Sequence, residues 1–262
     1  MTNSKANKHE VTNSKVMQQQ LIQYAQQYET ADFLNGDPSW FMHQVAEQRD
    51  QETIAFLAAA LSYGQRKQFM PKIEKMLYWS DNKPYDWVRN GGYKDFFFEN
   101  DKYSFYRLYT NHHMYCFLAR LQQLYKEYGS LGEYIQTQAT TGIEAVEAIC
   151  NYFAPIKTPI IPKDTTSACK RLCMFLRWMV RDNSPVDLGL WSHFIDKRTL
   201  IIPLDTHVLT EATRLQLINS RTATMATAQK LTRTLAEIFP DDPLRGDFAL
   251  FGYGVNKNSN GK

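Results

Sequence analysis

The chain contains the stretch SACKRLCMFLRWMVR at residues 167–181 and, after a connecting loop, the stretch LIIPLDTHV at residues 200–208. From Ala168 to Val180 there is no Gly or Pro, so about three turns of α-helix can form. The side chains are apolar on nearly every face, which is typical of a buried helix. Ser167 is a favourable N-cap for it. The first stretch therefore predicts a buried helix around which the rest of the chain is organised.

Basic residues interrupt the apolar surface of this helix. At 3.6 residues per turn, Lys170, Arg177 and Arg181 fall within one narrow stripe. The stripe indicates either a pocket or groove lined with positive charge, or a solvated edge where long basic side chains lie along apolar surface. Residues 155–182 hold six basic residues against two acidic ones, so the net charge of +3 is concentrated here.

The second stretch places Asp205 at the start of another helix. The run LIIPL is short, apolar and strand-like, and THVLTEATRLQL has the periodicity of a helix. Asp is an excellent N-cap, worth about 1 kcal/mol relative to Ala. Asp205 is therefore explained locally as a cap, and a functional role requires that Lys170 and Asp205 face a common pocket.

A strand-like run that ends in Pro and is followed by Asp-Thr-His-Val resembles the catalytic-aspartate segment of the helix-hairpin-helix DNA glycosylase superfamily. ETIAFLAAALSYGQRKQFMPKIEKML is similar to its early helix and the turn that approaches DNA opposite a flipped base, and RGDFALFGYGV resembles the last helix of 8-oxoguanine glycosylases. The nearest members are those enzymes and endonuclease III. The whole chain most closely resembles an uncharacterised bacterial family, the domain of unknown function 2400, through SACKR, FLRWMVR, DLGLW, PLDTHV and DFALFG.

The resemblance implies a DNA base-excision enzyme with AP-lyase activity, for which an oxidised purine is one candidate base. Lys170 would form a Schiff base with the sugar, and Asp205 would stabilise the positive charge that develops there. Lys170 lies at the start of a helix, close to other cations and in a buried segment, and these features favour loss of its proton. The base pocket would contain Asp247, Phe251, Asp187 and Trp191. The residues expected to contact DNA are Gln65, Arg66, Lys163, Ser167, Arg171, Arg177 and Arg181.

Simpler interpretations of these residues remain open. Asp247 is also a suitable helix cap, Phe251 a suitable core residue, and Gln65–Lys67 an ordinary solvated turn. The hairpin of the superfamily reads Leu-Pro-Gly-Val-Gly, whereas IIPKDTTSACK has no glycine, so phosphate capture would depend on the helix N-terminus and the polar residues before it. Lys170 and Asp205 are also 35 positions apart, farther than in most members.

Composition indicates one soluble globular protein. The 262 residues include 44% hydrophobic and 22% charged residues, and no run of about 18 apolar residues predicts a membrane span. No cysteine follows Cys173, and the iron–sulfur cluster of endonuclease III needs four there, so we expect no cluster, no metal and no other cofactor. Cys169 and Cys173 suit packed thiols in a reducing compartment. We expect a cytoplasmic monomer at the nucleoid, with DNA as its partner.

The rest of the chain favours an all-α fold, because no repeated β alternation with hairpin turns appears. Helices are predicted near residues 15–28, 50–63, 69–79, 112–128, 142–153, 222–239 and 247–255, and short helices within the aromatic segment 80–111. We expect one unit over residues 14–255 with flexible tails at 1–13 and 256–262. The resemblance implies two lobes, the N- and C-terminal helices sharing one, with the site in the cleft between them.

Two other functions remain as alternatives. A non-catalytic module of the same fold would bind DNA or RNA with salt-sensitive affinity and would not need Lys170 or Asp205. A helical protein for protein contacts would use the basic stripe against an acidic partner.

Overall fold

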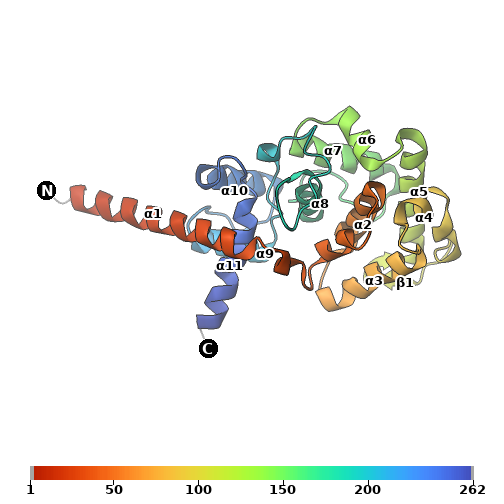
Figure 1. Cartoon of the computed structure of the whole chain (residues 1–262), viewed down its shortest axis with the longest axis horizontal. Helices are drawn as coiled ribbons and strands as arrows, with labels where there is room; N and C mark the ends of the chain where they lie inside the picture. The colour runs from red at the N-terminus through yellow and green to blue at the C-terminus, as the bar shows by residue number, and fades with distance from the viewer. Residues whose placement is uncertain (1–2, 261–262) are drawn as a thin grey trace.

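The computed structural model describes the backbone of residues 3–260 and the side chains of residues 15–254. Over that range the chain is mostly helical, which confirms the all-α class (Figure 1). The α-helices are α1 (Asn3–Tyr28), α2 (Gln48–Leu61), α3 (Arg66–Trp79), α4 (Pro84–Arg89), α5 (Asn111–Tyr128), α6 (Leu131–Gln138), α7 (Gly142–Phe153), α8 (Lys170–Val180), α9 (Thr206–Arg214), α10 (Met225–Ile238) and α11 (Arg245–Asn260). The 3-10 helices are η1 (Ala31–Leu34), η2 (Pro38–His43), η3 (Gly92–Asp95), η4 (Ala154–Ile156) and η5 (Lys197–Thr199).

The predicted central helix is α8, and its side chains from Leu172 to Val180 are buried. α8 packs against α2 and α7. Phe175 lies at the centre of this contact, with its ring centroid 5.1 Å from that of Phe56 on α2 and 5.2 Å from that of Trp191. Aromatic packing against two distant segments thus holds α8 in place, because burial of such large apolar side chains dominates core energetics.

The start of α8 differs from the prediction. The helix begins at Lys170, and its N-cap is Cys169, whose side chain caps no backbone N–H. Ser167 is therefore not the N-cap, and instead forms an isolated β-bridge with Thr224. Cys169 has φ +45°, in the left-handed region that non-glycine residues seldom adopt. The left-handed turn at Cys169 makes Lys170 the first residue of the helix.

The two ends of the chain lie together. α1 packs against α11, and α11 also packs against α9, while α3 to α7 occupy the other side of the molecule (Figure 1). The approach of α1 to α11 depends on Gly252, because an added Cβ there would lie 2.3 Å from the Tyr28 ring. α1 begins at Asn3, so residues 3–13 of the expected flexible tail belong to this helix, as do residues 256–260 to α11.

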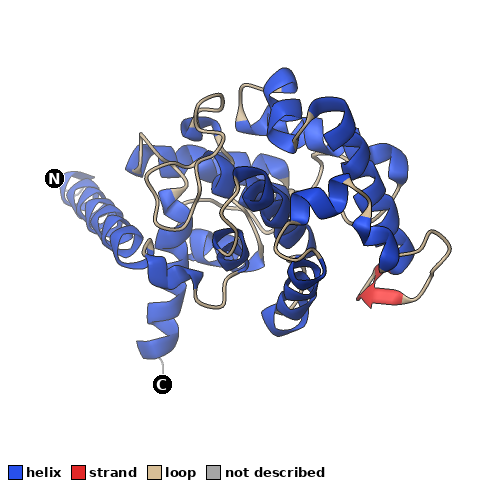
Figure 2. Cartoon of the chain, turned by 45° about the vertical axis from the view of Figure 1, so that its right-hand side comes forward, coloured by secondary structure: helices blue, strands red, loops and turns tan. Residues whose placement is uncertain are grey.

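The aromatic segment contains the one strand pair of the described residues, which the sequence interpretation missed. β1 (Ser104–Tyr106) and β2 (Tyr109–Thr110) form an antiparallel hairpin, drawn red in Figure 2. The strands are too short to show alternation, so periodicity gives no signal for them. Much of the surrounding aromatic segment forms core, as expected: Phe97 and Phe105 are buried and pack edge-to-face with ring centroids 5.0 Å apart.

The helices of the described residues include none that is both long enough and apolar enough to cross a bilayer.

Candidate functional site

The start of α8 and the start of α9 meet at one point. The Lys170 Nζ lies 3.1 Å from Asp205 Oδ2, and the two side chains are 37% and 35% exposed. The other carboxylate oxygen of Asp205, Oδ1, accepts the Val208 N–H at 2.9 Å and caps α9. The local explanation and the functional hypothesis for Asp205 are therefore compatible, because each uses a different oxygen of the same carboxylate.

The apolar run before Asp205 fixes its position. Leu200, Ile202 and Leu204 are buried, and the Ile202 N–H donates to Thr232 Oγ1 on α10 at 3.0 Å. The expected strand does not form over residues 200–204, so burial and the Thr232 hydroxyl hold this run in place of a sheet. Burial on this scale anchors the segment, and Asp205 emerges from the core directly at the cavity.

Lys170 and Asp205 line one cavity of about 220 Å³. Its ionic lining has three basic and three acidic groups, so the cavity is not electropositive by its own residues. Apolar side chains complete the walls. The lining residues are Phe33, Asp37, Arg66, Lys170, Met174, Arg177, Pro203, Asp205, His207, Val208, Asp247 and Phe251.

Asp205 and Asp247, two of the three aspartates of the cavity, have opposite pKa shifts. Burial raises the pKa of Asp205, but the Lys170 charge and the Val208 N–H outweigh it, so the pKa lies below its usual range. Burial also raises the pKa of Asp247, and the Asp205 charge adds to this rise although Arg177 opposes it, so the pKa lies above its usual range. Asp205 is thus an anion at neutral pH, as charge stabilisation would require.

Asp247 and Phe251 both face this cavity from α11, as the resemblance implied. They are four residues apart, so they share one face of the helix. Asp247 accepts a hydrogen bond from the Arg177 guanidinium. Phe251 packs edge-to-face on Phe33, with ring centroids 5.1 Å apart. The cavity therefore combines an acidic acceptor with an aromatic wall.

The basic stripe of α8 does not face solvent as a whole. Arg177 and Arg181 are 4% and 1% exposed. Asp187 lies between them, accepting from Arg177 Nε at 3.3 Å with one oxygen and from Arg181 Nη1 with the other. Buried guanidinium groups need such forked acceptors, because an unpaired buried charge is costly. Both were expected to contact DNA, which stays a prediction for Arg177 because it lines the cavity. Arg181 is enclosed by ion pairs and does not line it.

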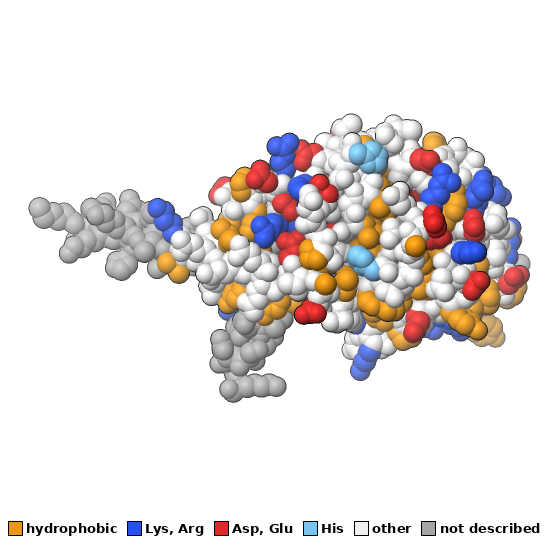
Figure 3. All heavy atoms as spheres, viewed as in Figure 1, with side chains coloured by type: hydrophobic (Ala, Val, Ile, Leu, Met, Phe, Trp, Pro, Cys, Tyr) orange, Lys and Arg blue, Asp and Glu red, His pale blue; other side chains and the backbone are white. Residues whose placement is uncertain are grey.

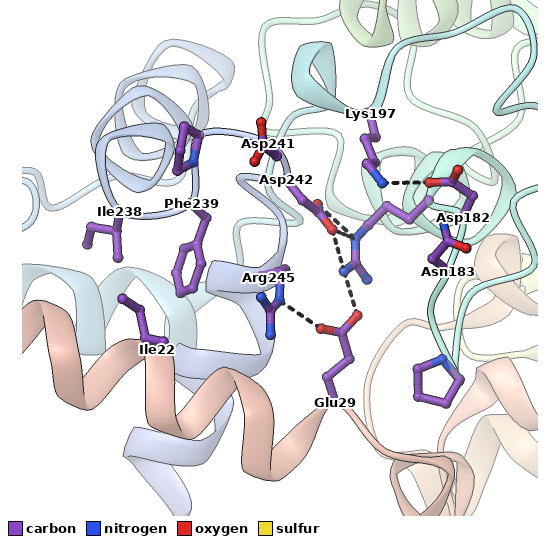
Figure 4. Close-up of a pocket in the computed structure, with 13 residues that line it drawn as sticks. Ile22, Glu29, Asp182, Asn183, Lys197, Ile238, Phe239, Asp241, Asp242 and Arg245 are labelled. Carbon is purple, nitrogen blue, oxygen red and sulfur yellow. Dashed lines mark hydrogen bonds and ion pairs between the residues drawn. The ribbon is translucent and has the colours of Figure 1, made fainter.

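Arg181 connects this buried network to a second cavity, of about 470 Å³. Its guanidinium donates to Asp242 at 2.8 and 3.0 Å and to Glu29 Oε1 at 2.5 Å. Figure 4 shows Glu29 rising from α1 toward Asp242 and Arg245, and Arg245 Nε lies 3.1 Å from Glu29 Oε2. Ion pairs therefore run without interruption from Asp247 in the first cavity to Arg245 in the second, through α8.

Asp187 and Trp191 do not line this cavity, contrary to the expectation that they share a pocket with Asp247 and Phe251. Asp187 is buried behind Arg177, and Trp191 lines a different cavity. The Trp191 Nε1–H donates to Glu52 Oε2 at 3.0 Å, and Glu52 also accepts the N–H groups of Leu131 and Gly132 at the start of α6. Burial raises the pKa of Glu52 to about 7. The loop that contains DLGLW thus stabilises the core through the hydrogen bond between Trp191 and Glu52.

The remaining predicted DNA contacts are distributed over three places. Gln65 is exposed at the N-cap of α3, and Arg66 lies at the rim of the first cavity, 3.0 Å from Asp37. Lys163 and Ser167 are exposed in the connection before α8. Arg171 is partly buried and donates through Nη1 to Tyr109 Oη at 2.6 Å and to the Ala60 carbonyl, so it braces α2 and the hairpin.

Several cavity residues were not predicted. Phe33, Asp37 and Met174 also line the cavity. Met174 lies one helical turn after Lys170 on α8, whereas no spacing relates Phe33 or Asp37 to Lys170. Asp37 caps η2 by accepting from the Ser39 N–H. His207 also lines the cavity, and its place in the first turn of α9, directly after Asp205 and Thr206, is the sequence signal that could have found it.

Residues 37–256 match the model of a family described as Protein of unknown function (DUF2400). The match covers most of the sequence, and the chain therefore belongs to this family. No curated protein and no solved structure matches the chain. The family's description gives no activity, so function has to be argued from the cavity.

Proposed function

We propose that this protein is a DNA glycosylase with AP-lyase activity, whose reaction takes place at Lys170 and Asp205. The observation that carries the proposal is the 3.1 Å pair of an ammonium and a carboxylate in a partly open cavity. Its 220 Å³ is below the roughly 300–1,000 Å³ of pockets for drug-sized ligands, and suits a single nucleobase. Asp247 would accept hydrogen bonds from the base, and Phe251 and Phe33 would line its sides.

The proposed chemistry begins with a nucleotide turned out of the duplex into the cavity. The C1′–N bond breaks with its electron pair going to the base, and the Asp205 anion stabilises the positive charge left on the sugar. The departing base takes a proton from the Lys170 ammonium, and the neutral amine then bonds to C1′. The C1′–O4′ bond then breaks, O4′ takes a proton from the bound nitrogen, and a Schiff base forms at C1′. Loss of a proton from C2′ finally breaks the C3′–O bond and expels the 3′ phosphate.

Borohydride reduction tests this proposal, because it converts a Schiff base into a stable amine. The full chain is incubated with duplex DNA containing an abasic site, and with a panel of damaged bases, in the presence of borohydride. We expect a protein–DNA adduct with the unaltered chain and with Lys163→Ala, whose residue is exposed in the same basic segment. We expect no adduct with Lys170→Ala. Equal trapping by both variants would contradict the proposal.

A non-catalytic nucleic-acid-binding module is the second candidate. The connection between α7 and α8 runs through residues 154–169 and includes η4, so no short helical hairpin joins the two helices. The Lys170–Asp205 ion pair also gives the lysine a structural role without chemistry. This candidate predicts salt-sensitive DNA binding that Lys170→Ala and Asp205→Asn leave unchanged, with no adduct from any variant.

A further inference from the structure

The described surface exposes few large hydrophobic side chains, and they are unevenly placed. Five of eight lie between residues 63 and 108, namely Tyr63, Tyr78, Phe98, Tyr103 and Leu108. Figure 3 shows hydrophobic side chains gathered at the lower right, where Figure 1 places α3 and β1. Exposed apolar side chains can mark a binding site, and Tyr63 and Leu108 lie near the hairpin, whereas Tyr78 lies at the far end of α3.

The turn of the hairpin presents an apolar residue to solvent. Leu108 is 66% exposed between β1 and β2, and the preceding Arg107 has φ +51°. That left-handed residue closes the two-residue turn and points successive side chains in fixed directions. A polar residue would suit such a turn better, so the exposed Leu108 is not explained by folding.

Tyr63 lies beside this turn, and its ring is held in place. The Arg107 guanidinium stands 4.7 Å from the ring centroid of Tyr63, and Tyr106 donates its hydroxyl hydrogen bond to the Tyr63 carbonyl. Tyr63 is still 38% exposed. Gly64 permits this approach, because its φ is +90° and an added Cβ would lie 2.3 Å from Arg107 Nη1. The ring and the cation are therefore arranged before any ligand binds.

Two short chain connections link the hairpin surface to the proposed reaction cavity. Tyr63 precedes Arg66, a lining residue of the cavity, by three positions. On the other side, Arg171 donates to Tyr109 of β2 at 2.6 Å, and Arg171 directly follows Lys170. The hairpin is thus braced against both the first turn of α8 and the end of α2.

We propose that Tyr63, Arg107 and Leu108 form a stacking site for an unpaired nucleobase next to the cavity. The inference rests on the proposed function and adds the strand state that the protein prefers. A flat aromatic ring with a guanidinium on it offers dispersion and cation–π attraction to any base face, and Leu108 adds apolar contact. Bases in an intact duplex are already stacked, so single-stranded DNA binds more tightly than duplex of equal length.

The test measures binding alone, so that it does not depend on catalysis. A fluorescent single-stranded oligonucleotide without damage is titrated with the full chain, and Kd is obtained from anisotropy. Stacking is worth about 1–3 kcal/mol per base, so Tyr63→Ala is expected to raise Kd by about 5- to 150-fold, and Leu108→Ser by a smaller factor. Tyr63→Phe keeps the ring and should stay within about twofold.

Tyr78→Ala is the matched control, because Tyr78 is 81% exposed but belongs to the far end of α3. Unchanged thermal unfolding of each variant excludes misfolding as the cause. Equal Kd values for the unaltered chain and Tyr63→Ala would overturn the inference, as would tighter binding of duplex. If the chain binds no nucleic acid and Leu108→Ser changes its oligomeric state, the inference is overturned. The surface would then be a contact between protein chains. If the oligonucleotide binds as expected but borohydride traps no adduct at Lys170, only the glycosylase proposal is rejected.

Discussion

The first turn and the last turns of α8 carry the same kind of residue in different surroundings. Lys170 is 37% exposed and faces one carboxylate across 3.1 Å. Arg181 is 1% exposed and is surrounded by the carboxylates of Asp187, Asp242 and Glu29. One basic stripe in the sequence is thus divided by the fold into an accessible amine and a buried framework, so the position of a charge on a helix does not determine its role.

Residue chemistry agrees with this division. A guanidinium stays charged and donates in several directions at once, which suits a buried network. An ammonium is a compact charge on a flexible stem, and it can lose its proton and react as an amine. Arg177 joins the two regions, since it pairs with Asp187 on one side and with Asp247 in the cavity on the other.

The largest expected effect comes from breaking the buried network. Asp187→Asn keeps the shape of the side chain but leaves two buried guanidinium groups without their shared counter-charge. Removal of one partner from such a pair costs about 3–5 kcal/mol, which urea unfolding should show. Asp196→Asn is the matched control, because its partner Arg198 is 64% exposed and the change should cost less than about 1 kcal/mol. Equal losses of unfolding free energy in Asp187→Asn and Asp196→Asn would contradict the difference between the buried and the exposed ion pairs.

Glu52 is a buried carboxylate held by N–H donors instead of guanidinium groups, so its contribution to stability should depend on pH. The pKa of Glu52 is about 7 when folded, against 4.5 in the unfolded chain. The folded state therefore binds the extra proton between these values, and the contribution of Glu52 to stability falls as pH rises from 4.5 to 7. Relative to Glu52→Gln, the free energy of unfolding should decrease by about 3 kcal/mol across this window. A difference independent of pH would contradict this assignment.

Asp205 has two separable roles, so two substitutions should separate them. Asp205→Ala removes the cap of α9 and should cost about 1 kcal/mol of unfolding free energy. Asp205→Ser restores a capping oxygen without the charge, and should recover most of that stability while adduct formation stays lost. Recovery of both stability and adduct formation in the serine variant would show that the carboxylate charge is not needed.

The smallest stability effect is expected at the accessible end of the stripe. Lys170→Met should change the unfolding free energy by less than about 1 kcal/mol, because the pair is more than one third exposed and screened by solvent. The lowered pKa of Asp205 means that this small contribution is present above pH 3.8 and is lost as pH falls below it. Unfolding curves at pH 7 and pH 3 check this, and a loss as large as that of Asp187→Asn would contradict it.

The sequence predicted what local signals determine. The extents of α5 and α7 follow from their breakers and caps: Gly129 and Ser130 separate α5 from α6, and Thr141 forms a capping box at the start of α7. The cap at Asp205 and the convergence of Lys170, Asp205, Asp247 and Phe251 were also predicted, although the latter came from the resemblance.

The burial of Arg181 could not be predicted, because it depends on residues far apart in the chain. Arg181 is buried because Glu29 and Asp242, from the two ends of the sequence, converge on it. No local pattern contains that information.

Two other differences have local causes. The left-handed backbone at Cys169 displaced the helix start from Ser167 to Lys170, and the strands of the hairpin are too short to show a period.

The central claim is that the amine at the first turn of α8 bonds covalently to the sugar. The most direct measurement is peptide mapping by mass spectrometry of the borohydride-reduced adduct formed on abasic-site DNA. The account predicts that the sugar remnant is found on Lys170. A remnant on another lysine or on the N-terminal amine, with Lys170 unmodified, would contradict it.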